Sequence, residues 1–251
     1  MARTTAIKLS EIPTTAPAEV KEKHIKEETE DLVERLGDLQ QRLYADGKHS
    51  VLVVLQGMDA SGKDGAAHKV FDKCRITGMT YHAFKKPSEE EFAHDFLWRV
   101  HKVVPQKGMI GIFNRSHYED ILIQRVHKWI DEERVQRRMA AINAFEENLL
   151  YDNNTLIFKF YMHISKEEQE KQLRQRMQEP DKYWKHNPGD WEERKLWDEY
   201  MKAYEYAINN SSIPWYICPV DDRWWRDYFI AKTLVDSLEQ LHIQMPPLAK
   251  E

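Results

Sequence analysis

Cysteine is scarce in this chain, which has only Cys74 and Cys218 among its 251 residues. They lie far apart and form no C-x-x-C pair, so neither a disulfide framework nor a cysteine-ligated zinc site is supported. Long apolar runs are also missing. The longest strongly apolar stretch, residues 51–55, is far shorter than a membrane-spanning helix, and residues 1–20 contain no apolar segment of the signal-peptide kind. We therefore expect a cytoplasmic protein without an export signal or a membrane anchor.

An overall excess of basic charge is absent as well. The chain has 37 Lys and Arg against 42 Asp and Glu, a formal net charge of -5, which argues against a protein that coats nucleic acid with a uniformly basic surface. Charged residues make up 31% and hydrophobic residues 41% of the sequence, as is typical of a globular protein rather than a disordered one. Any site for a polyanion must therefore be local.

What the sequence does contain is an alternation of short apolar runs with helical patterns. Residues 1–20, rich in Thr, Ala and Pro, are predicted to form a tail that crosses or decorates the rest of the chain. Residues 21–251 are predicted to form a single domain that begins with an amphipathic helix at 21–44. Five strands are predicted after this helix, at residues 51–56, 79–84, 109–113, 155–162 and 215–218.

Strands separated by helix-length segments indicate an α/β fold with a mainly parallel sheet. Because crossovers between parallel strands are right-handed, we expect helices on both faces of the sheet. Two serines mark expected helix starts, since Ser88 precedes Glu91 and Ser165 precedes Glu168 by three residues. At this spacing hydroxyl and carboxylate each accept a hydrogen bond from a free backbone N–H, so a reciprocal capping box is predicted at both sites.

A phosphate-binding loop is the most specific motif. The sequence GMDASGKDG lies directly after the strand VLVVLQ and before a helical segment, which is the G-x-x-x-x-G-K pattern in its strand–loop–helix context. Backbone N–H groups and the positive end of the helix dipole bind phosphate oxygens, and the lysine ammonium reaches the transferred phosphoryl group. The predicted phosphate ligands here are Gly57, Ser61, Gly62, Lys63 and Gly65. A merely tight strand–helix connection, or regulatory nucleotide binding without chemistry, are the alternative interpretations.

Acidic residues flank the lysine of this loop. Ser or Thr usually follows the lysine and supplies a hydroxyl to Mg²⁺, whereas this sequence has Asp64. Asp59 lies inside the loop itself. Two carboxylates beside Lys63, where an anionic substrate would bind, make chemical sense when a cation lies between them. We therefore predict that Asp59, Asp64 or both bind Mg²⁺.

Three motifs together resemble the polyphosphate kinase 2 family. They are GMDASGKDG, the segment FKKPS at 84–88 and the segment FNRSHYED at 113–120, and they come in the family's order. The resemblance covers nearly everything after Tyr44. It implies a P-loop kinase fold with a three-layer α/β/α core, a helical lid at about 171–190, and Mg²⁺-dependent phosphoryl transfer between inorganic polyphosphate and nucleotides. It also suggests a homo-oligomer, a dimer or a tetramer.

The resemblance also assigns roles to individual residues. Lys63 matches the family's loop lysine, Asp59 the loop aspartate that serves metal and catalysis, and Arg115 the arginine of the second motif. These three are the predicted catalytic residues, and Arg115 is also expected to bind phosphate.

The second motif departs from that of the single-domain ADP-forming members, which read D-R-S-W-Y-N-R where this chain reads N-R-S-H-Y-E-D. Asn114 replaces an expected carboxylate, while Glu119, a further candidate metal ligand, and Asp120 follow it. This variant resembles the branch that phosphorylates both AMP and ADP. His117 in the same motif is a candidate for a phosphate contact.

Basic side chains gather where a lid would close, in residues 171–186. Guanidinium groups bind the equatorial oxygens of a transferring phosphoryl group, so Arg174 and Arg176 are candidate arginine fingers. A helix whose charges only keep it solvated is the alternative interpretation. Lys85 and Lys86 end a predicted strand, where parallel α/β folds place ligands, and are predicted to form a track that leads polyphosphate to the phosphate loop.

These features predict an enzyme that transfers phosphoryl groups from inorganic polyphosphate to AMP, ADP or both with Mg²⁺, interconverting AMP, ADP and ATP and using no nucleic acid or membrane as a partner. One rival is an ATP-dependent nucleoside or nucleotide kinase of the thymidylate kinase type, against which Asp64 and the lysine pair speak. The other rival is a non-catalytic module that binds polyphosphate or nucleotide. Only Asn114 favours that second rival.

Overall fold

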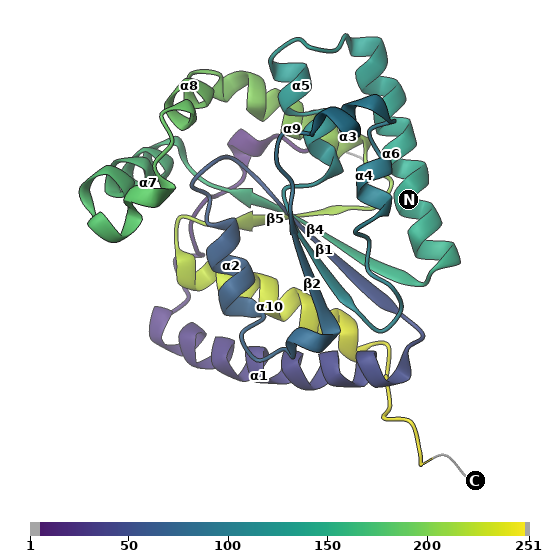
Figure 1. The fold of residues 1–251 in the computed structure, drawn as a ribbon. Helices are drawn as coiled ribbons and strands as arrows, with labels where there is room; N and C mark the ends of the chain where they lie inside the picture. Colours follow the sequence, from purple (N-terminus) through teal and green to yellow (C-terminus); the bar gives the residue numbers. More distant parts are fainter. Residues whose placement is uncertain (1–5, 249–251) are drawn as a thin grey trace.

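The computed structural model describes residues 6–248, which form a five-stranded sheet between two layers of helices (Figure 1). The order of the strands is β2-β3-β1-β4-β5, and every neighbouring pair is parallel. The strands span Ser50–Gln56 (β1), Met79–Ala83 (β2), Ile110–Asn114 (β3), Thr155–His163 (β4) and Trp215–Pro219 (β5). All five predicted strands are confirmed, with ends that differ by one residue at most.

Helices cover both faces of the sheet, which confirms the predicted three-layer α/β/α arrangement (Figure 1). One face carries α1 (Glu22–Asp46), α2 (Lys63–Val70) and α10 (Arg223–Glu239), and the other carries α6 (Glu132–Asp152) and α9 (Trp197–Asn210). The remaining helices are α3 (Glu89–Ala93), α4 (Trp98–His101), α5 (Ile123–Val126), α7 (Lys166–Gln178) and α8 (Gly189–Lys195). Short 3-10 helices are η1 (Leu9–Glu11), η2 (Ile76–Gly78), η3 (His117–Asp120) and η4 (Pro180–Lys185).

The central strand β1 explains the most apolar run of the sequence. It pairs with β3 on one side and β4 on the other, and all seven of its residues are buried. A strand covered by helices on both faces needs apolar side chains on both, so it does not alternate. Within residues 6–248, no helix is long and apolar enough to cross a bilayer.

Helix α1 buries the predicted apolar stripe, which includes Val33, Leu36 and Leu43. It ends at Gly47, whose positive φ of 63° lets the backbone N–H turn back to the Leu43 carbonyl at 3.1 Å. Glycine adopts this left-handed conformation at little steric cost and commonly ends helices for that reason.

The N-terminal strap, residues 7–16, crosses the carboxyl end of the sheet. Leu9 is buried in the core, and its N–H donates to Glu205 Oε1 at 2.8 Å. The Thr14 hydroxyl donates to Asp221 Oδ2 at 2.7 Å, directly after β5. The strap is thus fixed to the edge of the sheet that ligands use in parallel α/β folds.

Only one of the two predicted capping boxes is complete. At Ser88 the hydroxyl accepts from the Glu91 N–H, and the Glu91 carboxylate accepts from the Ser88 N–H at 2.8 Å. At Ser165 the hydroxyl accepts from the Glu168 N–H at 3.1 Å, but the Ser165 N–H donates to Asp221 Oδ1 at 2.9 Å. At Ser165 the predicted hydroxyl cap is confirmed, but the predicted carboxylate cap is wrong, because the Ser165 N–H donates to Asp221 and not to Glu168.

Candidate functional site

The phosphate loop joins the end of β1 to the start of α2, at the carboxyl edge of the sheet. Close packing explains two of its glycines. A Cβ atom on Gly57 would lie 2.8 Å from the Met162 carbonyl oxygen. Gly62 has a φ of +86°, and a Cβ atom there would lie 2.4 Å from Arg226 Nη1. Any larger residue would displace β4 or Arg226, so both the loop conformation and its neighbours require glycine.

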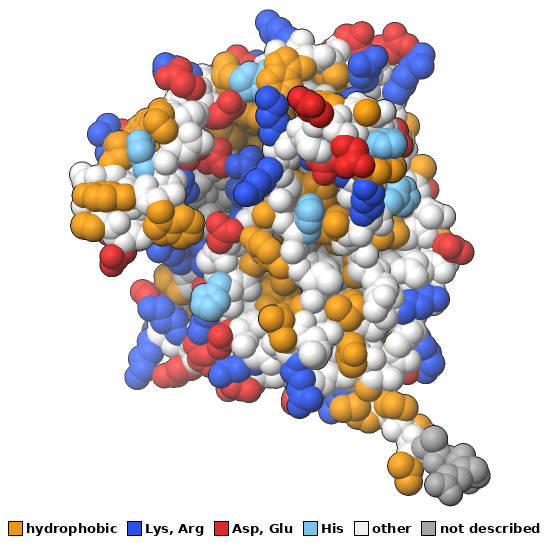
Figure 2. Space-filling view, in the orientation of Figure 1, with side chains coloured by type: hydrophobic (Ala, Val, Ile, Leu, Met, Phe, Trp, Pro, Cys, Tyr) orange, Lys and Arg blue, Asp and Glu red, His pale blue; other side chains and the backbone are white. Residues whose placement is uncertain are grey.

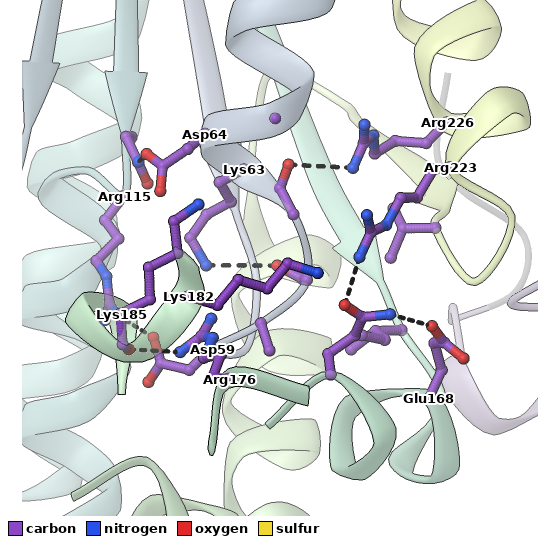
Figure 3. Close-up of a pocket in the computed structure, with 18 residues that line it drawn as sticks. Asp59, Lys63, Asp64, Arg115, Glu168, Arg176, Lys182, Lys185, Arg223 and Arg226 are labelled. Atoms are coloured by element: carbon purple, nitrogen blue, oxygen red, sulfur yellow. Dashed lines mark hydrogen bonds and ion pairs between the residues drawn. The ribbon is translucent and has the colours of Figure 1, made fainter. Parts of the chain in front are cut away.

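A cavity of about 310 Å³ opens over this loop and is lined by seven basic side chains but only three acidic ones (Figure 3). We call it the phosphate-loop cavity. In the space-filling view, Lys and Arg side chains gather in the hollow between the projecting α7–α8 segment and the rest of the molecule (Figure 2). Basic charge is thus concentrated locally in an otherwise acidic protein, as a site for a polyanion would require. The basic residues are Lys63, Arg115, Arg176, Lys182, Lys185, Arg223 and Arg226.

Lys63 folds back onto its own loop. Its Nζ donates to the carbonyl oxygens of Gly57 at 2.8 Å and Met58 at 2.9 Å. Burial, and then the nearby positive charge of Arg115, lower the pKa of Lys63 to about 8. Lys63 lines the cavity. Its ammonium contacts the carbonyl oxygens of its own loop, whereas the sequence predicted that it contacts the transferred phosphoryl group. An entering phosphate would compete with these carbonyls for the same donor.

Arg115 connects the second motif to the phosphate loop. Its guanidinium forms an ion pair with the Asp59 carboxylate, and its Nη1 lies 3.8 Å from Glu119 Oε2. Burial lowers the pKa of Arg115, but the carboxylates of Glu119 and Asp59 raise it by more, so the net shift is upward. Arg115 is therefore permanently charged, and two predicted catalytic residues, Arg115 and Asp59, contact each other directly.

Asp64 is hydrogen-bonded to Asn114, the residue that replaces the expected carboxylate of the second motif. Its Oδ1 accepts hydrogen bonds from the Tyr81 hydroxyl, at 2.8 Å, and from the Asn114 side-chain amide. Asn114, at the end of β3, also donates to the Tyr81 hydroxyl at 2.7 Å. An amide beside a carboxylate donates to it and orients it. A carboxylate from the first turn of α2 thus lies beside the end of β3, and Asn114 and Tyr81 orient it.

Asp59 and Asp64 offer oxygen ligands for a divalent cation. Both line the phosphate-loop cavity, whereas Glu119 accepts a hydrogen bond from Gln56 and lines a different cavity. Within residues 6–248, no group of three or more His, Cys, Asp and Glu side chains lies close enough to hold a metal ion by itself. Mg²⁺ is commonly bound by one or two carboxylates together with substrate phosphates. The aspartates of the loop fit a metal of that kind, with phosphate as the other ligand.

The segment from α7 to α8 projects beside the phosphate loop, at the position of the predicted lid (Figure 1). Arg176 lines the cavity and forms an ion pair with Asp190 at 2.7 Å. Arg174 does not line it: this side chain pairs with Glu170 at 2.7 Å and lies over the Trp191 ring. The structure therefore brings one of the two predicted lid arginines to the phosphate loop and not the other.

Two arginines of α10, Arg223 and Arg226, were missed by the sequence analysis (Figure 3). Arg226 is buried, forms an ion pair with Asp227 at 2.7 Å and donates to the Gly62 carbonyl at 3.3 Å. Arg223 donates to Gln172 on α7. Basic residues are unfavourable in the first turn of a helix because of the helix dipole. Two arginines there, directly after a strand, were a signal that another role requires them.

A second cavity of about 330 Å³ lies on the other side of Arg115, and we call it the aromatic cavity. Lys85 and Lys86 line it and do not line the phosphate-loop cavity, so the track that leads from them to the phosphate loop stays a prediction. They line this cavity because of the strand order: β3 lies between β2 and β1, so the loop after β2 opens on the far side of the second motif. The other residues that line the aromatic cavity include Phe84, Phe92, Arg99, Arg115, Glu119, Asp120 and Trp129.

Three further candidates lie away from both cavities. His117 is fully buried, and its Nε2 lies 3.2 Å from Glu146 Oε1, so the predicted phosphate contact is wrong. The lid segment also contains an aromatic pair, Tyr183 and Trp184, of the kind that could stack on a nucleobase. Both are exposed on η4 and line neither cavity.

This chain is similar to known proteins in sequence and in structure. The family model described as Polyphosphate kinase 2 matches residues 19–246. An AMP/ADP-polyphosphate phosphotransferase of Meiothermus ruber is 48% identical over 215 residues, which are 84% of this chain and 80% of the relative. An ADP-polyphosphate phosphotransferase of Rhodopseudomonas palustris is 41% identical over 229 residues, 85% of this chain and 79% of the relative. The crystal structure of polyphosphate kinase 2 from Arthrobacter aurescens TC1 superposes with a TM-score of 0.95 at 37% identity, covering 100% of this chain and 91% of that one.

Proposed function

The chain belongs to the polyphosphate kinase 2 family, and from that premise we propose that it transfers the terminal phosphoryl group of inorganic polyphosphate to AMP and to ADP. The phosphate-loop cavity carries this proposal. Its only apolar lining residues are Ala60, Ile164 and Val220, which offer little surface to a nucleobase. Seven basic side chains fit a donor that is a chain of phosphates and nothing else.

The aromatic cavity suits the acceptor nucleotide. Phe84, Phe92 and Trp129 provide apolar surface for a base, and Lys85 and Lys86 provide charge for its phosphates. Arg115 lines both cavities. We place the acceptor phosphate on one side of this guanidinium and the terminal phosphate of the donor on the other.

The reaction needs little covalent chemistry from the protein. An oxygen of the acceptor phosphate attacks the terminal phosphorus of polyphosphate, the bond to the bridging oxygen breaks, and the donor leaves one phosphate shorter. Negative charge spreads over the equatorial oxygens of the group in transfer. Lys63, Arg115 and Arg176 are the groups positioned to neutralise it, so catalysis rests on alignment and charge neutralisation.

Asp59 and Asp64 are the residues that would hold Mg²⁺ in this reaction. A bound Mg²⁺ would neutralise part of the phosphate charge. The carboxylate of Asp59 pairs with Arg115, so metal and guanidinium would compete for it. Assembly into a dimer or a tetramer stays a prediction.

Product analysis by chromatography tests the proposed function. The purified protein is incubated with Mg²⁺ and polyphosphate plus AMP or ADP, and in parallel with ATP plus nucleosides. We expect ADP and ATP to form from AMP at the expense of polyphosphate. Lys63→Met should abolish turnover without unfolding the protein, whereas Lys69→Met, which removes an exposed lysine of the same helix paired with Glu30, should not.

The other outcomes separate the rivals. Product from ADP alone would keep the family and overturn the wider acceptor range. Turnover only with ATP and nucleosides would favour the ATP-dependent kinase. Binding of polyphosphate without turnover would favour the non-catalytic module.

A further inference from the structure

An ion pair lies in the apolar interior, outside both cavities. Lys159 on the central region of β4 and Glu146 on α6 each have fully buried side chains, and Lys159 Nζ lies 2.5 Å from Glu146 Oε2. Removing two charges from water is costly, and an apolar pair of similar volume is often as stable or more so. Stability by itself therefore does not account for this pair.

The hydrogen bonds of the pair lead to the second motif. Glu146 Oε1 lies 3.2 Å from His117 Nε2, and Lys159 Nζ donates to the Tyr118 hydroxyl at 2.7 Å. Burial raises the pKa of Glu146, but Lys159 and His117 lower it by more, so the carboxylate stays charged. Two consecutive residues of the motif are thus held by a fixed pair of opposite charges.

Arg115, two residues before His117, has a strained backbone. Arg115 has a φ of +60°, in the left-handed region that side-chain-bearing residues seldom adopt. Such strain persists when the surroundings determine the conformation from several sides. On the β1 side, the Arg115 N–H donates to the Leu55 carbonyl at 2.9 Å, and the Ser116 hydroxyl donates to Gln56 Oε1 at 3.0 Å.

On the other side, the chain leaves this turn into His117 and Tyr118. The Tyr118 N–H donates back to the Ser116 hydroxyl at 3.2 Å, and the Tyr118 hydroxyl lies 3.0 Å from Ser211 Oγ. The buried charges hold this second anchor. Without these charges, His117 would lose its carboxylate partner and Tyr118 would keep only its hydrogen bond to Ser211 and its ring packing on this side of the turn.

We infer that Glu146 and Lys159 are positioning residues, which hold His117 and Tyr118 and thereby fix the left-handed turn that aims the Arg115 guanidinium between the two cavities. The inference deepens the proposed function and rests on it, because the role of Arg115 in phosphoryl transfer belongs to that proposal. The histidine at 117 then serves as an anchor of the turn, since its ring contacts a carboxylate of the core and no cavity.

A double variant distinguishes positioning from simple support of the core. Glu146→Leu/Lys159→Met removes both charges at similar volume. It also removes the carboxylate partner of His117 and one partner of the Tyr118 hydroxyl. Its stability in urea should stay near that of the wild type, because the saved cost of burying two charges offsets the lost hydrogen bonds. We expect its kcat to fall about ten- to hundredfold, with the KM for polyphosphate changed less than about threefold. A stable double variant with wild-type kcat would overturn the inference. The control is Thr155→Val, which removes a buried hydrogen bond to Ser50 at the first residue of β4. It should keep the wild-type kcat.

A double-mutant cycle with Arg115→Ala tests whether the buried ion pair affects catalysis through Arg115. If the pair acts through Arg115, adding the double substitution to Arg115→Ala should lower kcat/KM by less than about twofold more. Full additivity of the two losses would show that the pair acts elsewhere. Tyr118→Phe, which keeps the ring in the core and removes only its hydroxyl, provides a milder second variant, for which the same non-additivity is expected.

Hydrogen exchange gives a readout that does not depend on turnover. Backbone amides of residues 115–118 should exchange at least about tenfold faster in Glu146→Leu/Lys159→Met, and at the wild-type rate in Thr155→Val. Unchanged exchange would overturn the positioning role even in an active enzyme. Faster exchange in a protein that transfers no phosphate would keep the anchoring of the turn and would refute the proposed function alone.

Discussion

Arg174 and Arg176 are two positions apart on α7 and face opposite ways. Successive helical residues are about 100° apart, so residues i and i+2 point to nearly opposite sides. Arg176 reaches the phosphate-loop cavity, whereas Arg174 pairs with Glu170 on the outside. From the sequence both arginines were equal candidates, because the rotation of the helix relative to the loop depends on packing that no local pattern encodes.

We expect Arg176→Gln to lower kcat/KM for polyphosphate about ten- to hundredfold, because it removes a guanidinium that faces the phosphates. Arg174→Gln should change it less than about twofold, because exposed ion pairs contribute little. Steady-state kinetics at fixed ionic strength would compare the two variants, which share helix, charge change and residue type. Equal losses would mean that the charge of the whole segment matters and not the contact of one residue.

At the scale of elements, the position of β2 decides which cavity Lys85 and Lys86 line. Lys85 and Lys86 follow β2 and line the aromatic cavity, while Lys182 and Lys185 of η4 line the phosphate-loop cavity. We expect Lys85→Ala/Lys86→Ala to raise the KM for AMP about tenfold and to leave that for polyphosphate nearly unchanged.

Lys182→Ala/Lys185→Ala should raise the KM for polyphosphate about tenfold and leave the KM for AMP nearly unchanged. The rise in the KM for polyphosphate should become smaller at high salt, since exposed charges are screened. Both KM values are measured for both variants by varying one substrate at saturation of the other. A raised KM for polyphosphate in Lys85→Ala/Lys86→Ala would indicate that these lysines bind the donor. It would contradict the proposal that the donor binds in the phosphate-loop cavity and the acceptor in the aromatic cavity.

The elements themselves were predictable because their signals are local. Apolar runs, helical periodicity and the glycines of the phosphate loop indicated the strands, α1 and the loop. The pairing of β2 with β3 at the edge of the sheet, and the contact of His117 with Glu146, depend on residues far apart in the sequence. For that reason, local patterns did not show that Lys85 and Lys86 line the aromatic cavity or that His117 is buried beside Glu146.

At the scale of the whole molecule, the N-terminal strap and the end of the sheet are joined by a histidine that burial keeps neutral. His163, the last residue of β4, lies 3.1 Å from the Ile12 carbonyl through its Nε2. Burial lowers the pKa of His163, against the opposing effects of the Ile12 and Leu9 carbonyls and of Asp221. The native state therefore binds this proton less readily than the unfolded chain does.

Since the unfolded histidine binds a proton near its ordinary pKa of about 6.5 and the native one only at lower pH, the free energy of unfolding should fall as the pH drops below about 6.5. We expect His163→Gln to flatten this fall, because glutamine also donates to a carbonyl but does not titrate. Urea unfolding of both proteins at several pH values between about 7.5 and 5 measures the difference, and titration of other groups common to both cancels in the subtraction. Parallel curves would mean that His163 is protonated alike in both states and that the strap does not respond to pH through this contact.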